Sequence, residues 1–196
     1  MENQSRSSQI NRKTLETSIK LRLDVDKKDE VSIDTGLPFF DHILGSWCKH
    51  GWFGLQVEAA GDLEVGSHHL VEDTGICLGL ALKECLAQKQ GIKRFAHTII
   101  CMDDARVTVA VDLGGRPYLR FDVDMAAEDI QGFNTAVTED FFRAMVSNGC
   151  FNLHITKNSG INSHHIIEAV FKAVGITLYQ ATRIEGTDIP STKGIL

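Results

Sequence analysis

The stretch SHHLVE, residues 67–72, returns later in the chain as SHHIIE, residues 163–168. The two copies lie 96 residues apart in a sequence of 196 residues. Upstream of each copy stands a second related pair, GWFGL at 51–55 and GCFNL at 149–153, offset by 98 residues. Two matches in the same order and at nearly the same offset indicate that one structural unit is written twice.

Both units contain the same two kinds of helical segment. The shorter segments carry apolar residues at helical spacing, and the longer ones are mostly good helix formers with apolar stripes. We predict short helices at 37–50 and 135–148, and long helices at 68–90 and 164–182. Ser67 and Ser163 stand where an N-cap is expected, so each histidine pair should open a long helix.

Segments rich in β-branched and aromatic residues predict strands in both units. They are 13–25, 94–101, 105–113 and 116–124. Gly114-Gly115 separates the last two segments and is typical of a hairpin turn. The order strands, helix, strand, long helix predicts an α+β fold of two duplicated halves, each a mainly antiparallel sheet layered against helices.

The two halves should pack as one compact body, because no proline-rich or glycine-rich linker separates them. We expect a flexible polar N-terminus at 1–12, a first repeat half at 13–93 and a second at 94–196. A hydrophobic content of 43% is enough for a sizeable core.

The bulk properties exclude several classes of partner. A formal net charge of −6 argues against a nucleic acid bound through broad phosphate neutralisation. The apolar runs are too short to span a membrane, and residues 1–12 lack the apolar core of a signal peptide. The five cysteines form no CxxC pair, which is typical of reduced thiols. We therefore expect a cytoplasmic protein with a small-molecule substrate, without a nucleic-acid or membrane partner.

The repeated HHxxE motif has the spacing of a metal site. His68 and Glu72 are four residues apart, so they share one helix face, whereas His69 points about 100° away. The simplest use is for His68 and Glu72 to bind one metal ion while His69 reaches toward another. The second copy, with His164, His165 and Glu168, should do the same.

The upstream helices offer further ligands. His42 is the candidate in the first half, and the 98-residue offset places Asp140 at the matching position of the second. His154 is an alternative to Asp140, on a strand near the second motif. Mixed imidazole and carboxylate ligands suit manganese, iron, zinc or nickel, and ligand type does not choose among them.

Short motifs along most of the chain resemble one known family. They are TLET (14–17), FFDH (39–42), the two HHxxE motifs, GIKR (91–94), MDD (102–104), GRP (115–117) and STKG (191–194). In this order, from about residue 12 to the C-terminus, they resemble the imidazoleglycerol-phosphate dehydratases. The family often has aspartate where this chain has Ser67, and many members have histidine where it has Asp140.

The resemblance implies a fold, a reaction and an assembly. The fold is a pair of similar α+β halves of the ribosomal protein S5 domain 2-like type. The reaction removes water from imidazole glycerol phosphate to give imidazole acetol phosphate in histidine biosynthesis. It uses two manganese ions per active site, with a metal-bound imidazolate and a diazafulvene-like intermediate. The particle has 24 identical subunits, with active sites at subunit junctions.

The resemblance also implies residue roles. Glu16 is the first choice for proton transfer, and Lys172 lies one helical turn after Glu168, facing the same site. The residues implied to bind substrate are His42, His50, Arg94, Arg116, Ser191, Thr192 and Lys193.

Two other functions remain open from the residues alone. A dinuclear hydrolase with a metal-bound hydroxide would need bridging carboxylates, whereas most of the predicted ligands are imidazoles. A non-catalytic metal-binding protein would not need Arg94, Arg116 and Lys193.

Overall fold

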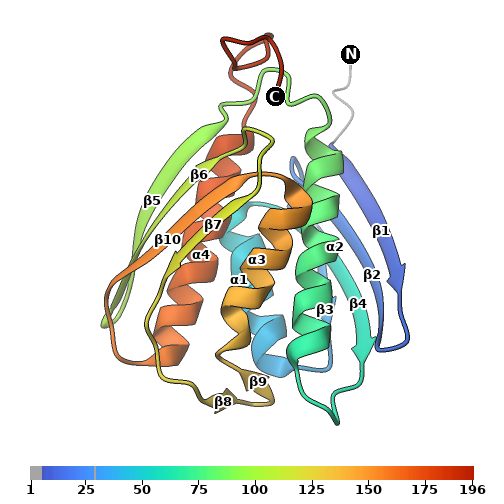
Figure 1. The fold of residues 1–196 in the computed structure, drawn as a ribbon, viewed down its shortest axis with the longest axis vertical. Coiled ribbons are helices and arrows are strands. Elements are labelled where there is room, and N and C mark those ends of the chain that lie inside the picture. The colour runs from blue at the N-terminus through green and yellow to red at the C-terminus, as the bar shows by residue number, and fades with distance from the viewer. Residues whose placement is uncertain (1–5, 29) are drawn as a thin grey trace.

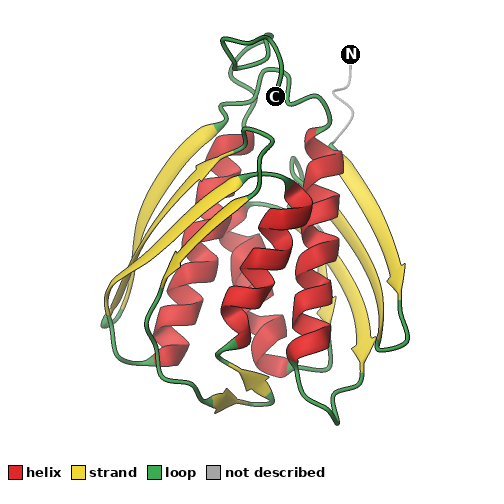
Figure 2. Ribbon diagram, in the orientation of Figure 1, coloured by secondary structure: helices red, strands yellow, loops and turns green. Residues whose placement is uncertain are grey.

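Four helices lie between two four-stranded sheets in the computed structural model, which describes residues 6–28 and 30–196 (Figures 1 and 2). The first half contains β1 (Ser7–Lys13), β2 (Thr17–Asp24), β3 (Val31–Asp34), α1 (Pro38–Gly51), β4 (Gly54–Gly61) and α2 (His68–Leu86). The second half contains β5 (Phe95–Met102), β6 (Ala105–Asp112), β7 (Tyr118–Asp122), α3 (Val137–Gly149), β10 (Asn152–Ser159) and α4 (Ser163–Thr182). A short ribbon of β8 (Asp129–Ile130) and β9 (Phe133–Asn134) precedes α3.

The two sheets have the same topology. Their strand orders are β1-β2-β4-β3 and β5-β6-β10-β7. In each sheet the last strand pairs in parallel with its neighbour, and the other pairs are antiparallel. The predicted α+β fold with duplicated, mainly antiparallel halves is thus confirmed.

The long helix of each half packs on the short helix of the other half. α2 lies against α3 and α4 against α1. Glycines allow both close approaches, because a Cβ at Gly79 would collide with the backbone oxygen of Met145, and one at Gly175 would lie 2.5 Å from that of Trp47. This crossed packing brings the start of each long helix beside the short helix of the other half.

The hairpin predicted at Gly114-Gly115 is wrong. β6 and β7 are not neighbours, because β10 lies between them and pairs with both. The glycines mark a turn, but a turn signal does not identify the strand that the next segment joins. That partner is set by packing between segments far apart in the sequence.

The prediction of a flexible segment at 1–12 is also wrong from Ser7 onward, and residues 1–5 lie outside the described residues. β1 pairs with β2 along its whole length, from Ser7 opposite Asp24 to Lys13 opposite Ser18. Its inward residues include polar ones that find partners on α2: the Ser8 hydroxyl donates to Glu84. The segment is polar and nevertheless forms a strand, because its inward polar side chains have hydrogen-bond partners.

The long helices begin differently from the prediction. Ser67 is the N-cap residue of α2, but its side chain makes no capping bond and instead accepts from the backbone N–H of Asn134 (3.2 Å). Ser163 is already within α4, which is capped by the Asn162 side chain. α2 also ends at Leu86 rather than at residue 90, because Ala87 has a positive φ of 42°.

None of the helices in residues 6–28 and 30–196 is long and apolar enough to cross a membrane.

Candidate metal centre

The N-terminal ends of α2 and α4 lie at the same end of the molecule, opposite to the C terminus (Figure 1). Both HHxxE motifs open at this end, which we call the ligand end. The crossed helix packing places His42 of α1 beside α4 and Asp140 of α3 beside α2. Each predicted cluster therefore combines residues from both halves of the duplication.

His42, His164 and Glu168 form the first cluster. Nε2 of His42 and Nε2 of His164 lie 3.4 and 3.3 Å from the same carboxylate oxygen of Glu168. Among the described residues, this is the one group of three whose possible ligand atoms all lie within 4.8 Å of one another. Two imidazoles and one carboxylate are a donor set that suits a divalent transition metal such as manganese.

Glu168 is buried but remains ionised. Burial alone would raise the pKa of this carboxyl, but hydrogen bonds and charges from Lys172 and His42 outweigh it and lower the pKa. The Lys172 ammonium lies 2.9 Å from the second carboxylate oxygen of Glu168. One oxygen of Glu168 thus faces the histidines and the other faces Lys172.

His68, Glu72 and Asp140 form the second cluster. Nε2 of His68 lies 3.5 Å from Glu72, and Nδ1 of the same ring lies 3.5 Å from Asp140. Because His68 and Glu72 correspond to His164 and Glu168, an ion here would bind at Nε2. Asp140 then faces the other nitrogen, where a carboxylate orients a ligand ring. Direct binding of an ion by Asp140 stays a prediction.

The second histidine of each motif faces away from both clusters. The rings of His68 and His69 are inclined at 78°, and those of His164 and His165 at 86°. Nδ1 of His69 lies 3.0 Å from Asp62, and Nδ1 of His165 lies 2.7 Å from Asp104.

These two carboxylates determine which ring nitrogen is free. The hydrogen bond to Asp62 raises the pKa of His69, and bonds from Ile161 and His165 lower the pKa of Asp104. A carboxylate at Nδ1 holds the proton there, which leaves Nε2 to bind a metal. His69 and His165 therefore offer Nε2 as the ligand atom, although Nε2 of His165 faces Asp103 at 3.6 Å and neither ring belongs to either cluster.

A cavity of about 430 Å³ lies beside the first cluster. It is lined by Asp41, His42, Gly45, Ser46, Lys49, His50, Glu168 and Lys172. The structure thus brings His50 and Lys172 to the same cavity as His42. Glu16 lies beside His69 instead, where its carboxylate is 4.0 Å from Nδ1 of that ring.

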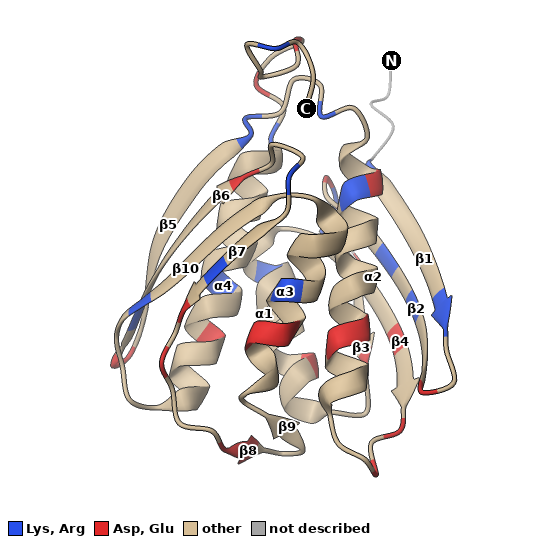
Figure 3. Ribbon diagram, viewed as in Figure 1, with Lys and Arg blue, Asp and Glu red and all other residues tan. Residues whose placement is uncertain are grey.

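The residues predicted to bind phosphate lie at the opposite end of the molecule. The backbone N–H of Arg94 donates to the oxygen of Ala181 (2.9 Å), close to the C-terminal end of α4, whereas His164 lies at its start. The 17 helical steps between His164 and Ala181 correspond to about 26 Å. Arg116 and the tail with Ser191, Thr192 and Lys193 lie at this same end, where Lys and Arg occupy the loops near the C terminus (Figure 3).

Arg94 also has a structural task. Its Nε and Nη2 donate to the two oxygens of Asp112 (2.7 and 3.2 Å), and its Nη1 donates to the backbone oxygen of Pro190 (2.7 Å). A guanidinium has five N–H groups, so two are left for a further acceptor. Arg94 thus fixes the start of the tail and could still bind an anion.

Comparison with known proteins gives the family. The profile described as imidazoleglycerol-phosphate dehydratase matches residues 35–178. The enzyme of that name from Desulforudis audaxviator is 50% identical over 192 residues, covering 97% of this chain and 98% of the relative. The one from Caldicellulosiruptor saccharolyticus is 47% identical over 192 residues, covering 98% and 99%.

The chain belongs to the imidazoleglycerol-phosphate dehydratase family. The crystal structure of the Staphylococcus aureus dehydratase matches with a TM-score of 0.82 at 35% identity, covering 91% of this chain and 99% of that one. The Pyrococcus furiosus enzyme in complex with (S)-C348 matches with a TM-score of 0.83 at 35% identity, covering 95% and 100%. The resemblance seen in the sequence is confirmed, and the chain is an enzyme of the hydro-lyase class.

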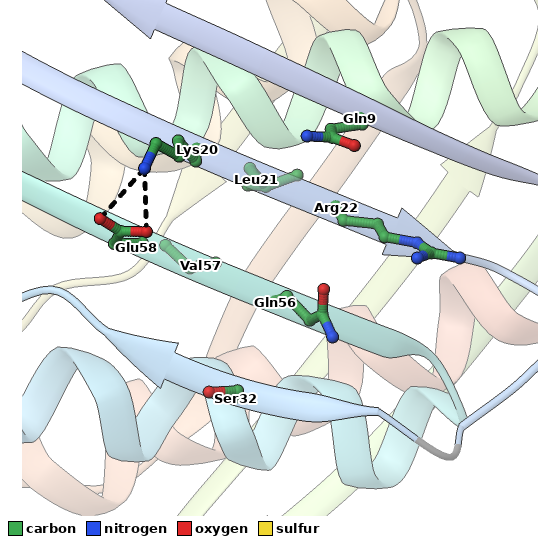
Figure 4. Close-up of a pocket in the computed structure, with 8 residues that line it drawn as sticks. All are labelled: Gln9, Lys20, Leu21, Arg22, Ser32, Gln56, Val57 and Glu58. Atoms are coloured by element: carbon green, nitrogen blue, oxygen red, sulfur yellow. Dashed lines mark hydrogen bonds and ion pairs between the residues drawn. The ribbon is translucent and has the colours of Figure 1, made fainter.

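One predicted residue and a second hollow lie outside both clusters. His154 lies on β10 between the buried Leu153 and Ile155, so it faces the outer side of the sheet, with its ring 5.4 Å from that of Tyr118. In the described part of the chain it makes no hydrogen bond or ion pair with the second cluster, whereas Asp140 lies 3.5 Å from Nδ1 of His68. A polar hollow of about 350 Å³ on the outer face of the first sheet contains none of the predicted site residues (Figure 4).

Sequence reasoning did not predict the roles of Asp62 and Asp104. Asp104 stands in the MDD motif, but Asp62 follows β4 at a position where the duplication offers Gly160. Repeat matching finds residues that both halves share. It cannot find a partner that each half takes from a different loop.

Proposed function

We propose that this chain converts imidazole glycerol phosphate to imidazole acetol phosphate in histidine biosynthesis, with two manganese ions per active site. The observation that supports this most strongly is the pair of imidazole–carboxylate clusters, one at the start of each repeated helix, in a chain of this family. An imidazole substrate has two ring nitrogens, so a site with two ions can hold the ring at both.

The donor sets indicate which residues would hold the ions. His42, His164 and Glu168 would hold one. His68 and Glu72 would hold the other, with Asp140 orienting the His68 ring. When bound, manganese supplies a Lewis acid that withdraws electron density from the ring and a template that orients it. Nε2 of His69 and Nε2 of His165 would complete sites whose other ligands come from a different copy of the chain.

Dehydration needs a group that takes a proton from the carbon beside the ring and one that assists loss of the hydroxyl. Glu16 lies on an exposed turn beside His69, and Lys172 lies beside Glu168. We propose that these two residues share the proton transfers. Lys172 is held by Glu168 and by the Met102 sulfur at 3.0 Å, so its ammonium is fixed at the cavity wall.

The distance between the two ends of the chain supports an oligomeric site. A few covalent bonds of about 1.5 Å each separate the imidazole from the phosphate, so one substrate cannot reach both ends of one chain. We therefore propose that the phosphate cradle comes from another copy. Exposed apolar side chains at the ligand end, Leu15, Val65 and Ile161, agree with contacts between copies there. The count of 24 subunits stays a prediction.

The test is a product assay with the purified protein and imidazole glycerol phosphate. Loss of water without release of inorganic phosphate, with formation of an enolisable ketone, is expected. Release of inorganic phosphate would instead identify a hydrolase. Metal binding without any product would identify a non-catalytic metal-binding protein.

A further inference from the structure

A buried polar trio connects β1, β2 and α2 next to the second cluster. Thr17 and Asp73 are 4% and 8% exposed. The Thr17 hydroxyl donates to one oxygen of Asp73, and Nη2 of Arg12 lies 2.8 Å from the other. Asp73 directly follows Glu72, so the trio lies against a helix turn that carries predicted metal ligands.

The second half of the molecule has no such trio at the matching positions. Thr17 opens β2 as Ala105 opens β6, and Asp73 follows Glu72 as Ala169 follows Glu168. Arg12 pairs with the third residue of β2, and Ile100 pairs with the third residue of β6. The counterparts of Arg12, Thr17 and Asp73 are therefore Ile100, Ala105 and Ala169.

This comparison inside one chain shows that the fold can fill the same place with apolar side chains. Ala105 and Ala169 are fully buried, at 1% and 0% exposure. Replacing a buried polar network by well-packed apolar groups is often neutral or stabilising, so stability does not account for the trio. The trio is therefore explained by a role that only the first half performs.

The hydrogens of the network run in one direction. The Thr17 hydroxyl has a single hydrogen, which it donates to Asp73. Its oxygen can therefore only accept a hydrogen bond from the Thr14 hydroxyl, 3.2 Å away. The Thr14 oxygen in turn accepts from the backbone N–H groups of Glu16 (3.1 Å) and Thr17 (2.9 Å). The chain of bonds thus leads from the Asp73 carboxylate to the turn at residues 14–16.

That turn carries Glu16. The backbone N–H of Glu16 donates to the Thr14 hydroxyl oxygen. The backbone oxygen of Glu16 accepts from the N–H of Asp62 at 3.2 Å. Asp62 is the residue that orients His69. Among residues 6–28 and 30–196, the Glu16 carboxylate has no polar contact shorter than the 4.0 Å to His69, so the turn determines where it points.

We propose that Thr17 and Asp73 are positioning residues, which hold the Glu16 turn so that its carboxylate meets the substrate. This inference rests on the proposed function, in which Glu16 transfers a proton. A displacement of about 1 Å at a reacting group can cost on the order of a hundredfold in rate. Loss of the Thr17 hydroxyl should therefore lower kcat without removing metal.

The test compares Thr17→Val, Thr17→Ser and Asp73→Asn in the full-length protein, with Thr177→Val as the matched control. Thr177 lies on α4, is also buried, and donates to the backbone oxygen of Ala173 (2.7 Å). We expect Thr17→Val and Asp73→Asn to lower kcat by roughly tenfold to a hundredfold. KM, metal content and assembly should stay unchanged, Thr17→Ser should restore kcat, and Thr177→Val should leave it unaltered.

A double-mutant cycle with Glu16→Gln separates positioning from general damage. If Thr17 acts through Glu16, Thr17→Val should lower kcat no further once Glu16→Gln is present. Additive losses would overturn the inference, as would unchanged kcat in both Thr17→Val and Asp73→Asn. If Glu16→Gln itself leaves kcat unchanged, the inference is overturned while dehydration stands. A protein with no dehydratase turnover before any substitution would overturn the proposed function.

Discussion

His42 and His164 turn their Nε2 atoms toward one carboxylate oxygen of Glu168, with ring centroids 5.9 Å apart, although they belong to different halves of the duplication. The contact exists because α4 packs on α1 across the duplication. The site is therefore a product of how the two halves pack, and neither half contains a complete cluster.

The ligand assignment predicts how metal content responds to substitution. Glu168→Gln should remove the ion held by the first cluster and lower manganese per chain by about half. Asp140→Asn should weaken manganese affinity about 10-fold to 100-fold, since loss of a carboxylate that orients a ligand histidine typically has that effect. Metal analysis after dialysis against graded free manganese measures both.

His154→Gln is the control for this experiment, because His154 is the alternative to Asp140 and lies on the outer sheet face. Its manganese content should equal that of the unaltered protein. A loss of metal in His154→Gln with none in Asp140→Asn would reverse the assignment.

The separation of metal ligands and phosphate cradle predicts complementation between inactive variants. Glu168→Gln removes a ligand at one end, and Lys193→Ala removes a cation at the other. If each site takes its two parts from different copies, co-assembled chains should regain about a quarter of full activity. Turnover is measured after the two variants are dissociated, mixed in equal amounts and reassembled.

Samples mixed without dissociation are the control and should stay inactive. Mixed assemblies that also stay inactive would show that each chain supplies both parts of its own site.

Stability should depend on pH through Asp26. Burial alone would raise its pKa, but hydrogen bonds from Arg6 and the charges of Arg6 and Arg183 outweigh it and lower the pKa. A carboxyl with a lowered folded-state pKa stabilises the fold above its unfolded pKa. This contribution is lost as pH falls below that value and through the folded pKa. Asp26→Asn should therefore cost about 1 kcal/mol near pH 7, because the pair is partly exposed.

Urea unfolding of both proteins at a series of pH values measures this contribution. The difference in free energy of unfolding should shrink below about pH 4, where the unfolded carboxyl takes up its proton. A difference that stays constant down to pH 3 would contradict the assignment.

The helix crossings predict opposite effects for two glycine substitutions. Gly79→Ala should destabilise the fold by about 1–3 kcal/mol, because the added Cβ collides with the α3 backbone. Gly45→Ala on α1 meets no atom within 4 Å, and it should stabilise the helix by up to about 1 kcal/mol. Chemical denaturation compares the two variants, and equal effects would show that the crossing does not depend on Gly79.

The repeat and its periodicity predicted the fold class and all four main helices, because the apolar stripes of these helices face the core. They failed at β1, whose inward polar residues are satisfied by α2, and at β7, whose partner β10 is distant in sequence. Local pattern contains no information on such pairing.

The candidate site was likewise predicted only in part. The motif spacing led to His68 with Glu72 and His164 with Glu168, pairs one helical turn apart. The sequence could not show that Asp62 and Asp104 face the second histidines, or that Arg94 lies beside Ala181, about 26 Å along α4 from His164. Those relationships arise from loops and helix length in three dimensions.

The most direct test of the central claim is turnover of imidazole glycerol phosphate before and after removal of metal. The protein is stripped with a chelator, and manganese is added back in steps while ketone product and bound metal are measured together. The account predicts no turnover without metal, and full recovery only when both clusters are filled. Turnover that survives complete removal of metal would contradict it.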